Sequence, residues 1–281
     1  MKTFSTIPGK ENKQSVPCAL CGAAHQNSIC LECEGFYFIK CRKCGLVFQN
    51  PQPLSEELLG RYKSNYFVYE KNNEEIFYDL MKKGLNDIGF NIIRDRLGVN
   101  KTFLDVGCAT GRLIADMEKD GWDVRGVEVC REAALFGQRE RGLDIFIGSL
   151  EKALYPDNFF SVIHASHLIE HLADPGSFFK EAYRLLEDGG YLIIATPNID
   201  GFQAGLFKAK WRSAIADHMY LFSRKTLTEL AEKSGFSVKR VKTWGGLAAG
   251  SAPQIIKRVF DFLAKILNIG DVMILLLKKI P

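Results

Sequence analysis

The chain has 281 residues, which is enough for one full-size α/β domain and a smaller appendage. Hydrophobic residues make up 47% and charged residues 25%, a globular composition that excludes a disordered chain. The net charge of +4 is too small to call for a nucleic-acid partner, and no apolar run approaches the roughly 20 residues of a membrane span. The first ten residues lack the apolar core of a secretory signal, so we expect a cytoplasmic protein without a transmembrane segment.

The cysteines cluster near the N-terminus. Cys18 and Cys21 form one C-x-x-C pair and Cys41 and Cys44 a second, and a glycine follows each pair. The length of the segment between the pairs suits a zinc ribbon with four thiolate ligands, a closed structural site. Cys30 and Cys33 form a third pair, so a quartet that combines them with Cys41 and Cys44 stays open.

Composition divides the chain into three regions. Residues 1–53 form the cysteine-rich ribbon, and residues 54–98 are predicted to be a helical connector with acidic helix starts at Glu56–Glu57 and Glu74–Glu75. Residues 99–281 alternate short apolar runs with helical patterns, which is typical of a mostly parallel sheet. The sequence therefore predicts an α/β fold.

The alternation also locates the elements. Helices are predicted from near Gly111 and Arg131 and over Lys225–Ser234. A further helix is predicted to begin at Asp174, its N-cap, and to end at Gly189–Gly190. Strands are predicted at Thr102–Val106, Asp123–Val129, Asp144–Ile147, Ser161–His164, Tyr191–Thr196, Phe236–Thr243 and Val272–Leu277.

The first of these strands leads into a glycine-containing turn. Gly107 and Gly111 have no side chain and Ala109 has only a methyl group, so a ligand can approach the backbone closely. A dinucleotide fingerprint needs a third glycine where the chain has Arg112, which argues against NAD or FAD. Glu128 ends the second strand, where its carboxylate could accept hydrogen bonds from both ribose hydroxyls; the alternative is an exposed acid without a role.

The run Leu104–Gly111 resembles motif I of class I S-adenosylmethionine-dependent methyltransferases, in particular those of types 11, 12 and 23. Phe160–Leu172 and Tyr191–Asn198 are similar to their fourth-strand and fifth-strand motifs, and the similarity covers about residues 100–281. It implies a Rossmann-like, seven-stranded, mostly parallel sheet whose last strand runs antiparallel between strands five and six. It also implies S-adenosylmethionine as cofactor, bound by Asp105, Gly107, Cys108, Ala109, Gly111, Glu128, Val129, Ser149, Leu150 and Ser166.

Some positions depart from the family pattern. Ala109 replaces the middle glycine of motif I, and Ser149 and Ser161 stand where the family often has aspartate. The N-terminal region has its own likeness, because Cys41–Pro53 resembles a run found in methyltransferases that carry a zinc ribbon. This likeness favours the outer cysteine pairs as the zinc ligands.

Methyl transfer needs a base only when the acceptor is a hydroxyl or a similar protonated group. The resemblance is closest to ubiquinone-type O-methyltransferases, and His218 and His167 are the predicted catalytic residues. In those enzymes an acidic residue at the position of His167, with the pair at Glu170–His171, can hold a divalent ion. The alternative for Glu170 and His171 is capping and hydrogen bonding.

Two further segments are expected to modify the domain. Residues 199–223 form a predicted lid, and residues 253–268 carry an amphipathic helical stripe. This helix is expected to pack on the domain, on a partner subunit or over the acceptor pocket, with a membrane-surface role as the alternative.

The predicted function is S-adenosylmethionine-dependent O-methylation of a small molecule. The alternatives are a non-enzymatic zinc-ribbon or nucleoside-binding adaptor and a nicotinamide-dependent oxidoreductase. No nucleic-acid partner is expected, and a homodimer is left open.

Overall fold

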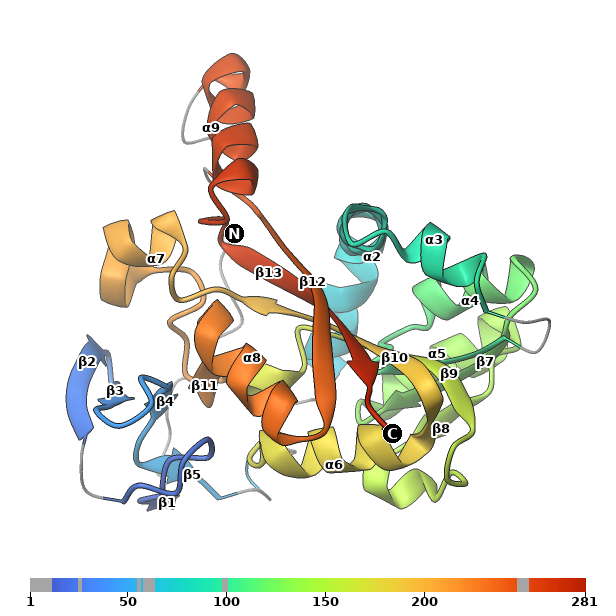
Figure 1. The fold of residues 1–281 in the computed structure, drawn as a ribbon, viewed down its shortest axis with the longest axis horizontal. Coiled ribbons are helices and arrows are strands. Elements are labelled where there is room, and N and C mark those ends of the chain that lie inside the picture. The colour runs from blue at the N-terminus through green and yellow to red at the C-terminus, as the bar shows by residue number, and fades with distance from the viewer. Residues whose placement is uncertain (1–11, 25–26, 55–56, 58–63, 98–100, 247–252) are drawn as a thin grey trace.

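A seven-stranded sheet forms the centre of the computed structural model, which describes residues 12–24, 27–54, 57, 64–97, 101–246 and 253–281 (Figure 1). The strand order is β12-β13-β10-β9-β6-β7-β8. Strands β8, β7, β6, β9 and β10 pair in parallel, and β13 lies between β10 and β12, antiparallel to both. The strands are β6 (Thr102–Val106), β7 (Asp123–Glu128), β8 (Ile145–Ile147), β9 (Phe160–Ser166), β10 (Leu186–Pro197), β12 (Phe236–Trp244) and β13 (Val272–Lys279). The predicted Rossmann-like fold is confirmed.

Helices cover both faces of the sheet, so each face buries its own hydrophobic core. Phe103 and Leu104 are neighbours on β6 and point to opposite faces. Phe103 packs in the core that includes residues of α2, α3 and α4, and Leu104 in the core that includes residues of α6 and α8. The helices are α2 (Ser64–Asp87), α3 (Phe90–Arg94), α4 (Arg112–Lys119), α5 (Arg131–Arg141), α6 (Pro175–Leu185) and α8 (Arg224–Lys233).

Two predicted helix boundaries are wrong. Helix α6 ends at Leu185 and not at Gly189–Gly190, because Leu186 already takes extended backbone and pairs with Phe160 of β9. Helix α2 runs through Glu74–Glu75 without a break, and the next helix begins only after Gly89, whose φ is 74°. The helix start expected at Glu56 lies outside the described residues.

The N-terminal region forms a second sheet with a segment that is remote in sequence. Its order is β11-β4-β3-β2, from β2 (Asn27–Cys33), β3 (Phe36–Cys41), β4 (Val47–Gln49) and β11 (Tyr220–Leu221). Strands β1 (Lys13–Gln14) and β5 (Gln52–Pro53) pair separately. Tyr220 pairs with Phe48, and their buried rings stack with centroids 6.3 Å apart. The ribbon therefore holds the segment that leads from β10 towards β12.

The lid region and the C-terminal insertion contribute two more helices, α7 (Phe202–Phe207), followed by the 3₁₀ turn η3 (Lys208–Lys210), and α9 (Gln254–Ile266). Along the chain, helix α9 follows β12 and precedes β13, and it projects from the body of the molecule (Figure 1). Among its side chains with described burial, only Ala264 is buried. No helix in the described ranges is both long enough and apolar enough to cross a membrane.

Candidate active site

The turn after β6 has the backbone that its glycines predict. Gly107, Ala109 and Gly111 all have positive φ, at 75°, 48° and 74°. Gly111 caps α4, and a Cβ atom there would lie 2.5 Å from Leu143 Cδ1, so a side chain would not fit. Ala109 reaches the left-handed region at a modest conformational cost, which keeps the turn in shape without the family's middle glycine.

Glu128 faces this turn from the end of β7. The Ala109 N–H donates to Glu128 Oε2 at 2.9 Å, and the Cys130 N–H donates to Oε1 at 2.7 Å. The side chain is buried, and burial raises its pKa. Glu128 is thus not the exposed strand-end acid of the alternative interpretation. Each carboxylate oxygen also retains a lone pair for a further donor.

The other predicted cofactor positions lie along the same edge of the sheet. The Gly148 N–H donates to the Glu128 carbonyl at 2.9 Å, which places Ser149 next to the end of β7. Ser149 precedes the 3₁₀ turn η1 (Leu150–Ala153), whose Leu150 is buried, and Ser166 ends β9. Val129 directly follows β7.

Asp105 has a different environment from these residues. It lies within β6, is buried, and its Oδ1 is 2.7 Å from Nδ1 of His164 on the neighbouring strand β9. The buried pair satisfies both side chains across two strands. A direct role of Asp105 toward the cofactor stays a prediction.

Helix α2 covers the turn, which the sequence does not predict. A small cavity of about 30 Å³ remains between them. It is lined by Glu70, Glu74, Phe77, Met81, Cys108, Ala109, Thr110, Arg112 and Leu113. Ligand sites typically measure about 300–1,000 Å³. The i, i+4 spacing of Glu70 and Glu74 puts two like charges on one helix face, and this unfavourable pair is the signal that could have pointed to them.

Polar contacts fasten α2 in this position. The Thr110 hydroxyl donates to Glu74 Oε1, and Arg141 Nη2 donates to Glu74 Oε2 at 2.8 Å. The carboxylate of Glu74 therefore connects α2 both to the turn after β6 and to helix α5. Glu75 adds an ion pair with Arg112 at 2.9 Å.

Unlike Glu74, Glu70 makes no ion pair with a lysine or arginine among the described residues. Burial and the nearby charge of Glu128 raise its pKa to about 7, although His167 opposes the shift. The site is thus acidic, with two glutamates of α2 and one of β7 around the same turn.

A second group of polar side chains follows β9. Glu170, His171 and His218 offer one ligand atom each within 4.8 Å of one another. Glu170 lies in the 3₁₀ turn η2 (Ile169–His171), is fully buried, and accepts a hydrogen bond from the Thr196 hydroxyl at 2.9 Å. Its other oxygen, Oε1, has no hydrogen-bond partner in the described part of the chain, although His167 Nδ1 lies 3.3 Å away in an ion pair. His167 itself is half exposed, with a φ of 52°.

The two other histidines are oriented by backbone carbonyls. His171 Nδ1 lies 3.0 Å from the Asp217 carbonyl, and His218 Nδ1 lies 2.8 Å from the Ser213 carbonyl. A carbonyl accepts only, so each Nδ1 carries the proton and Nε2 is the basic nitrogen of a neutral ring. The rings are nearly perpendicular, with centroids 4.6 Å apart.

Burial controls the charges in this group. It lowers the pKa of His218 to about 3, with a smaller effect from His171, so His218 is neutral at physiological pH. Burial raises the pKa of Glu170, but the proximity and charge of His167 and of the other imidazoles outweigh it and lower that pKa to about 2. A buried carboxylate beside two oriented imidazoles can hold a divalent cation or receive a proton.

The ribbon cysteines form a third cluster. Cys18 Sγ lies 3.4 Å from Cys44 Sγ, and Cys21 Sγ lies 3.6 Å from Cys41 Sγ. All four sulfur atoms are within 4.8 Å of one another. Tetrahedral zinc with bonds of about 2.3 Å needs sulfur atoms about 3.8 Å apart. The geometry suits this group better than the alternative quartet, because Cys30 is exposed and Cys33 contacts the carbonyls of residues 209 and 214.

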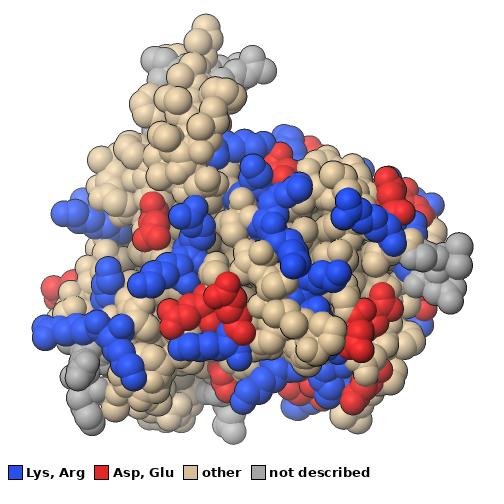
Figure 2. Space-filling model, in the orientation of Figure 1, with Lys and Arg blue, Asp and Glu red and all other residues tan. Residues whose placement is uncertain are grey.

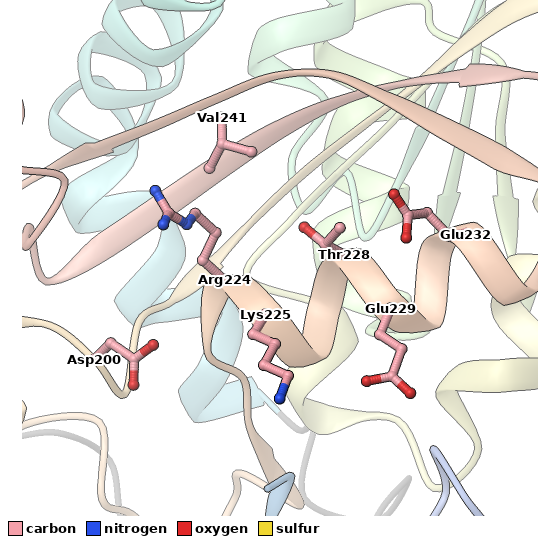
Figure 3. Close-up of a pocket in the computed structure, with 7 residues that line it drawn as sticks. All are labelled: Asp200, Arg224, Lys225, Thr228, Glu229, Glu232 and Val241. Carbon is pink, nitrogen blue, oxygen red and sulfur yellow. The ribbon is translucent and has the colours of Figure 1, made fainter. Parts of the chain in front are cut away.

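A larger hollow lies elsewhere on the described surface (Figure 3). It has a volume of about 660 Å³ and runs along α8 and β12. Arg224, Lys225, Glu229 and Glu232 line it, so both signs of charge border it. None of the predicted site residues contributes to it.

A family model described as a methyltransferase domain matches residues 74–241, more than half of the chain. The chain belongs to this methyltransferase family. This membership bears out the resemblance of the sequence to class I S-adenosylmethionine-dependent methyltransferases.

Curated relatives match over shorter stretches. A ubiquinone biosynthesis O-methyltransferase of Caulobacter vibrioides is 33% identical over 103 residues, 34% of this chain and 41% of the relative. An S-adenosylmethionine-dependent methyltransferase of Mycolicibacterium smegmatis is 31% identical over 141 residues, 48% of this chain and 52% of the relative. The chain thus spans about half the length of these relatives, or less.

Solved structures show the same fold. A chain from a Haloferax volcanii complex between the Trm112 methyltransferase activator and a methyltransferase has a TM-score of 0.60 at 15% identity, covering 80% of this chain and 98% of that one. A methyltransferase of Archaeoglobus fulgidus has a TM-score of 0.55 at 18% identity, covering 76% of this chain and 99% of that one.

Replacing Glu70 by glutamine should stabilise the protein in a pH-dependent way. The pKa of Glu70 is raised from 4.5 to about 7 in the folded state, so the cost to folding grows between these two pH values and is complete above about pH 7. We expect Glu70→Gln to raise the free energy of unfolding by about 1–2 kcal/mol at pH 8 and to have little effect at pH 5, where the folded wild type is protonated. Urea unfolding across this range measures the difference, with Asp79→Asn, at an exposed position on the same helix, as control. A variant no more stable than wild type at pH 8 contradicts the assignment.

Proposed function

We propose that this methyltransferase methylates a hydroxyl group of a small molecule. The observation that carries the proposal is the buried group of Glu170, His171 and His218, because an oxygen acceptor must lose a proton when it gains the methyl group. The relatives of Caulobacter and Pseudomonas that are named ubiquinone biosynthesis O-methyltransferases support oxygen as the acceptor atom.

In this proposal the cofactor lies on the turn after β6. Glu128 accepts hydrogen bonds from the ribose hydroxyls, and Ser149 and Leu150 contact the adenine. Because the present cavity measures about 30 Å³, helix α2 shifts outward to admit the cofactor. The carboxylates of α2 then face a ligand whose sulfonium is positively charged, which favours its binding.

His218 acts as the base. The cofactor would supply the methyl group, which the acceptor oxygen would take in exchange for its proton, and His218 Nε2 would receive that proton. The sulfur leaves as a neutral thioether, and the carboxylate of Glu170 stabilises the imidazolium that forms. The low pKa of His218 keeps the ring neutral but makes it a weak base, so the role requires the nearby Glu170 carboxylate to stabilise the imidazolium. His167, beside Glu170 at the open side of the group, is the second candidate.

The four ribbon cysteines Cys18, Cys21, Cys41 and Cys44 hold a structural zinc ion. The supporting observation is their sulfur geometry, and β4, which follows Cys44, pairs with β11. Only Met219 lies between His218 and β11. Zinc in the ribbon therefore also stabilises the segment that places the base.

Removal of the Glu128 carboxylate should weaken cofactor binding. Glu128→Ala loses charge-assisted hydrogen bonds, so the Kd for S-adenosylmethionine should rise by about 10- to 100-fold in calorimetry. Glu118→Ala, an exposed position on α4, serves as control. An unchanged Kd for a folded Glu128→Ala protein would show that the ribose role is wrong.

Loss of the base should slow turnover and spare cofactor binding. Asparagine at position 218 retains a donor for the Ser213 carbonyl but cannot take a proton, so His218→Asn should lower kcat by about 100-fold or more. The assay follows S-adenosylhomocysteine release with a panel of phenols and sugars, and His167→Asn is measured in parallel. Normal turnover of His218→Asn across the pH range, with a slow His167→Asn, would transfer the role to His167.

Metal analysis distinguishes the two cysteine quartets. Purified protein should contain one zinc ion per chain, and Cys44→Ser should lose it while Cys30→Ser retains it. Chelation should lower the Tm and reduce turnover, because the sheet that includes β11 loosens. Loss of zinc from Cys30→Ser would support the alternative quartet.

A further inference from the structure

Exposed apolar side chains concentrate on two helices. Ten of the nineteen exposed large hydrophobic side chains in the described ranges lie on α7, α9 or the residue after α9. They are Phe202, Leu206, Phe207, Ile255, Val259, Phe260, Phe262, Leu263, Ile266 and Leu267. We call this surface the α7–α9 patch. Such a concentration of exposed apolar side chains marks a surface that binds another protein or a membrane.

The geometry of α9 directs its apolar stripe away from the protein. Ala264 faces the body, where its carbonyl accepts hydrogen bonds from Ile269 N–H and the Thr243 hydroxyl. Val259, Phe262 and Ile266 follow one another at helical spacing and are 52%, 63% and 57% exposed. Helix α9 itself stands clear of the sheet (Figure 1).

Helix α7 extends the same surface. The rings of Phe202 and Phe260 lie with centroids 6.2 Å apart, so α7 contacts the side of α9. Leu206 and Phe207 are 58% and 45% exposed on α7. The patch is therefore continuous over two helices from separate parts of the chain.

The two segments that carry the patch are net positive, although Lys265 pairs with Asp87 and Arg212 with Asp271. Segments 202–212 and 253–267 contain six lysines or arginines and one acid, Asp261. Asp261 is already bound by Lys257 Nζ at 2.5 Å and by the Gly246 N–H at 2.8 Å. Lys208 and Lys210 are exposed directly after α7. Figure 2 shows the projecting helix as an almost uncharged surface with Lys and Arg side chains near its base.

We propose that the α7–α9 patch docks on the surface of an anionic lipid bilayer. An apolar face bordered by lysines is the composition of helices that lie in the membrane interface, with the apolar side chains among the acyl chains and the cations at the headgroups. With 13 residues, α9 is about 20 Å long, shorter than a hydrocarbon core of about 30 Å, so it enters one leaflet only.

A bilayer fits the patch better than a second copy of the chain. A helix pair needs a narrow apolar seam with polar residues beside it. Here Leu263 and Leu267, 43% and 61% exposed, widen the stripe of α9, and α7 widens it again. Lys257 and Lys265 already pair with Asp261 and Asp87, but two copies would bring the exposed Lys208 and Lys210 of each chain close together, whereas anionic headgroups would neutralise them.

Vesicle sedimentation with the full chain tests the proposal. Wild type should pellet with phosphatidylcholine vesicles that contain phosphatidylglycerol and bind plain phosphatidylcholine vesicles more weakly. The double variant Phe262→Asp, Ile266→Asp should lower binding by about tenfold or more, and Lys208→Glu, Lys210→Glu should remove the preference for the anionic lipid. Leu154→Asp, at an 82% exposed position elsewhere, is the matched control and should bind like wild type.

Circular dichroism verifies that each variant is folded. Equal pelleting of wild type and the folded Phe262→Asp, Ile266→Asp variant would overturn the proposal. A second outcome would also overturn it. If wild type does not bind vesicles but forms a dimer in analytical ultracentrifugation, and the Phe262→Asp, Ile266→Asp variant is monomeric, the patch is a self-association surface. Neither vesicle binding nor the oligomeric state depends on which reaction the protein catalyses.

Discussion

The carboxylate of Glu128 joins the two strand ends on which the cofactor turn depends. It accepts one N–H from the turn after β6 and one from the start of α5, so a single buried group fixes both backbones. A buried carboxylate is costly unless donors satisfy it, and these two N–H groups supply the compensation. The glycines at 107 and 111 allow the turn to come this close. The strongest local constraint of the domain thus lies where a ligand would approach the backbone.

A second constraint links the ribbon to the chemistry. Strand β11 belongs to the sheet of the ribbon, yet the residues just before it include His218, and the Met219 N–H donates to the Glu170 carbonyl at 2.7 Å. Two parts of the chain about 170 residues apart therefore share one short strand pairing. The buried ring stack of Phe48 and Tyr220 adds apolar contact to the few hydrogen bonds of that pairing. Loss of the ribbon would accordingly affect the position of His218 before it affects the central sheet.

Local patterns in the sequence predict most of the central domain, because its information is local. The N-cap Asp174 and the apolar runs of β6, β9 and the second half of β10 act within a few residues, and the predictions that rest on them are confirmed. The helix end at Gly189–Gly190 was wrong because pairing of Leu186 with β9, a tertiary contact, outweighed the local signal of two glycines.

What the sequence does not predict arises from contacts between distant segments. The packing of α2 over the turn depends on Glu74 meeting Thr110 and Arg141, and the pairing of β11 with β4 depends on two short strands of little individual preference. The partnership of Asp105 with His164 depends on strand order in the sheet. Such contacts leave no periodicity in the chain, so they become visible only in three dimensions.

The acidity of the cofactor region favours binding of a cationic cofactor over binding of its neutral product. Glu70, Glu74 and Glu128 surround one turn, and burial together with the charge of Glu128 raises the pKa of Glu70 to about 7. In the proposed reaction the cofactor arrives with a cationic sulfonium and leaves as a neutral thioether. Negative charge held by folding therefore stabilises the reactant more than the product. In this proposal a bound cation relieves the repulsion between the glutamates of α2 and Glu128. The repulsion returns after methyl transfer, and it then favours the outward shift of α2 that releases the product.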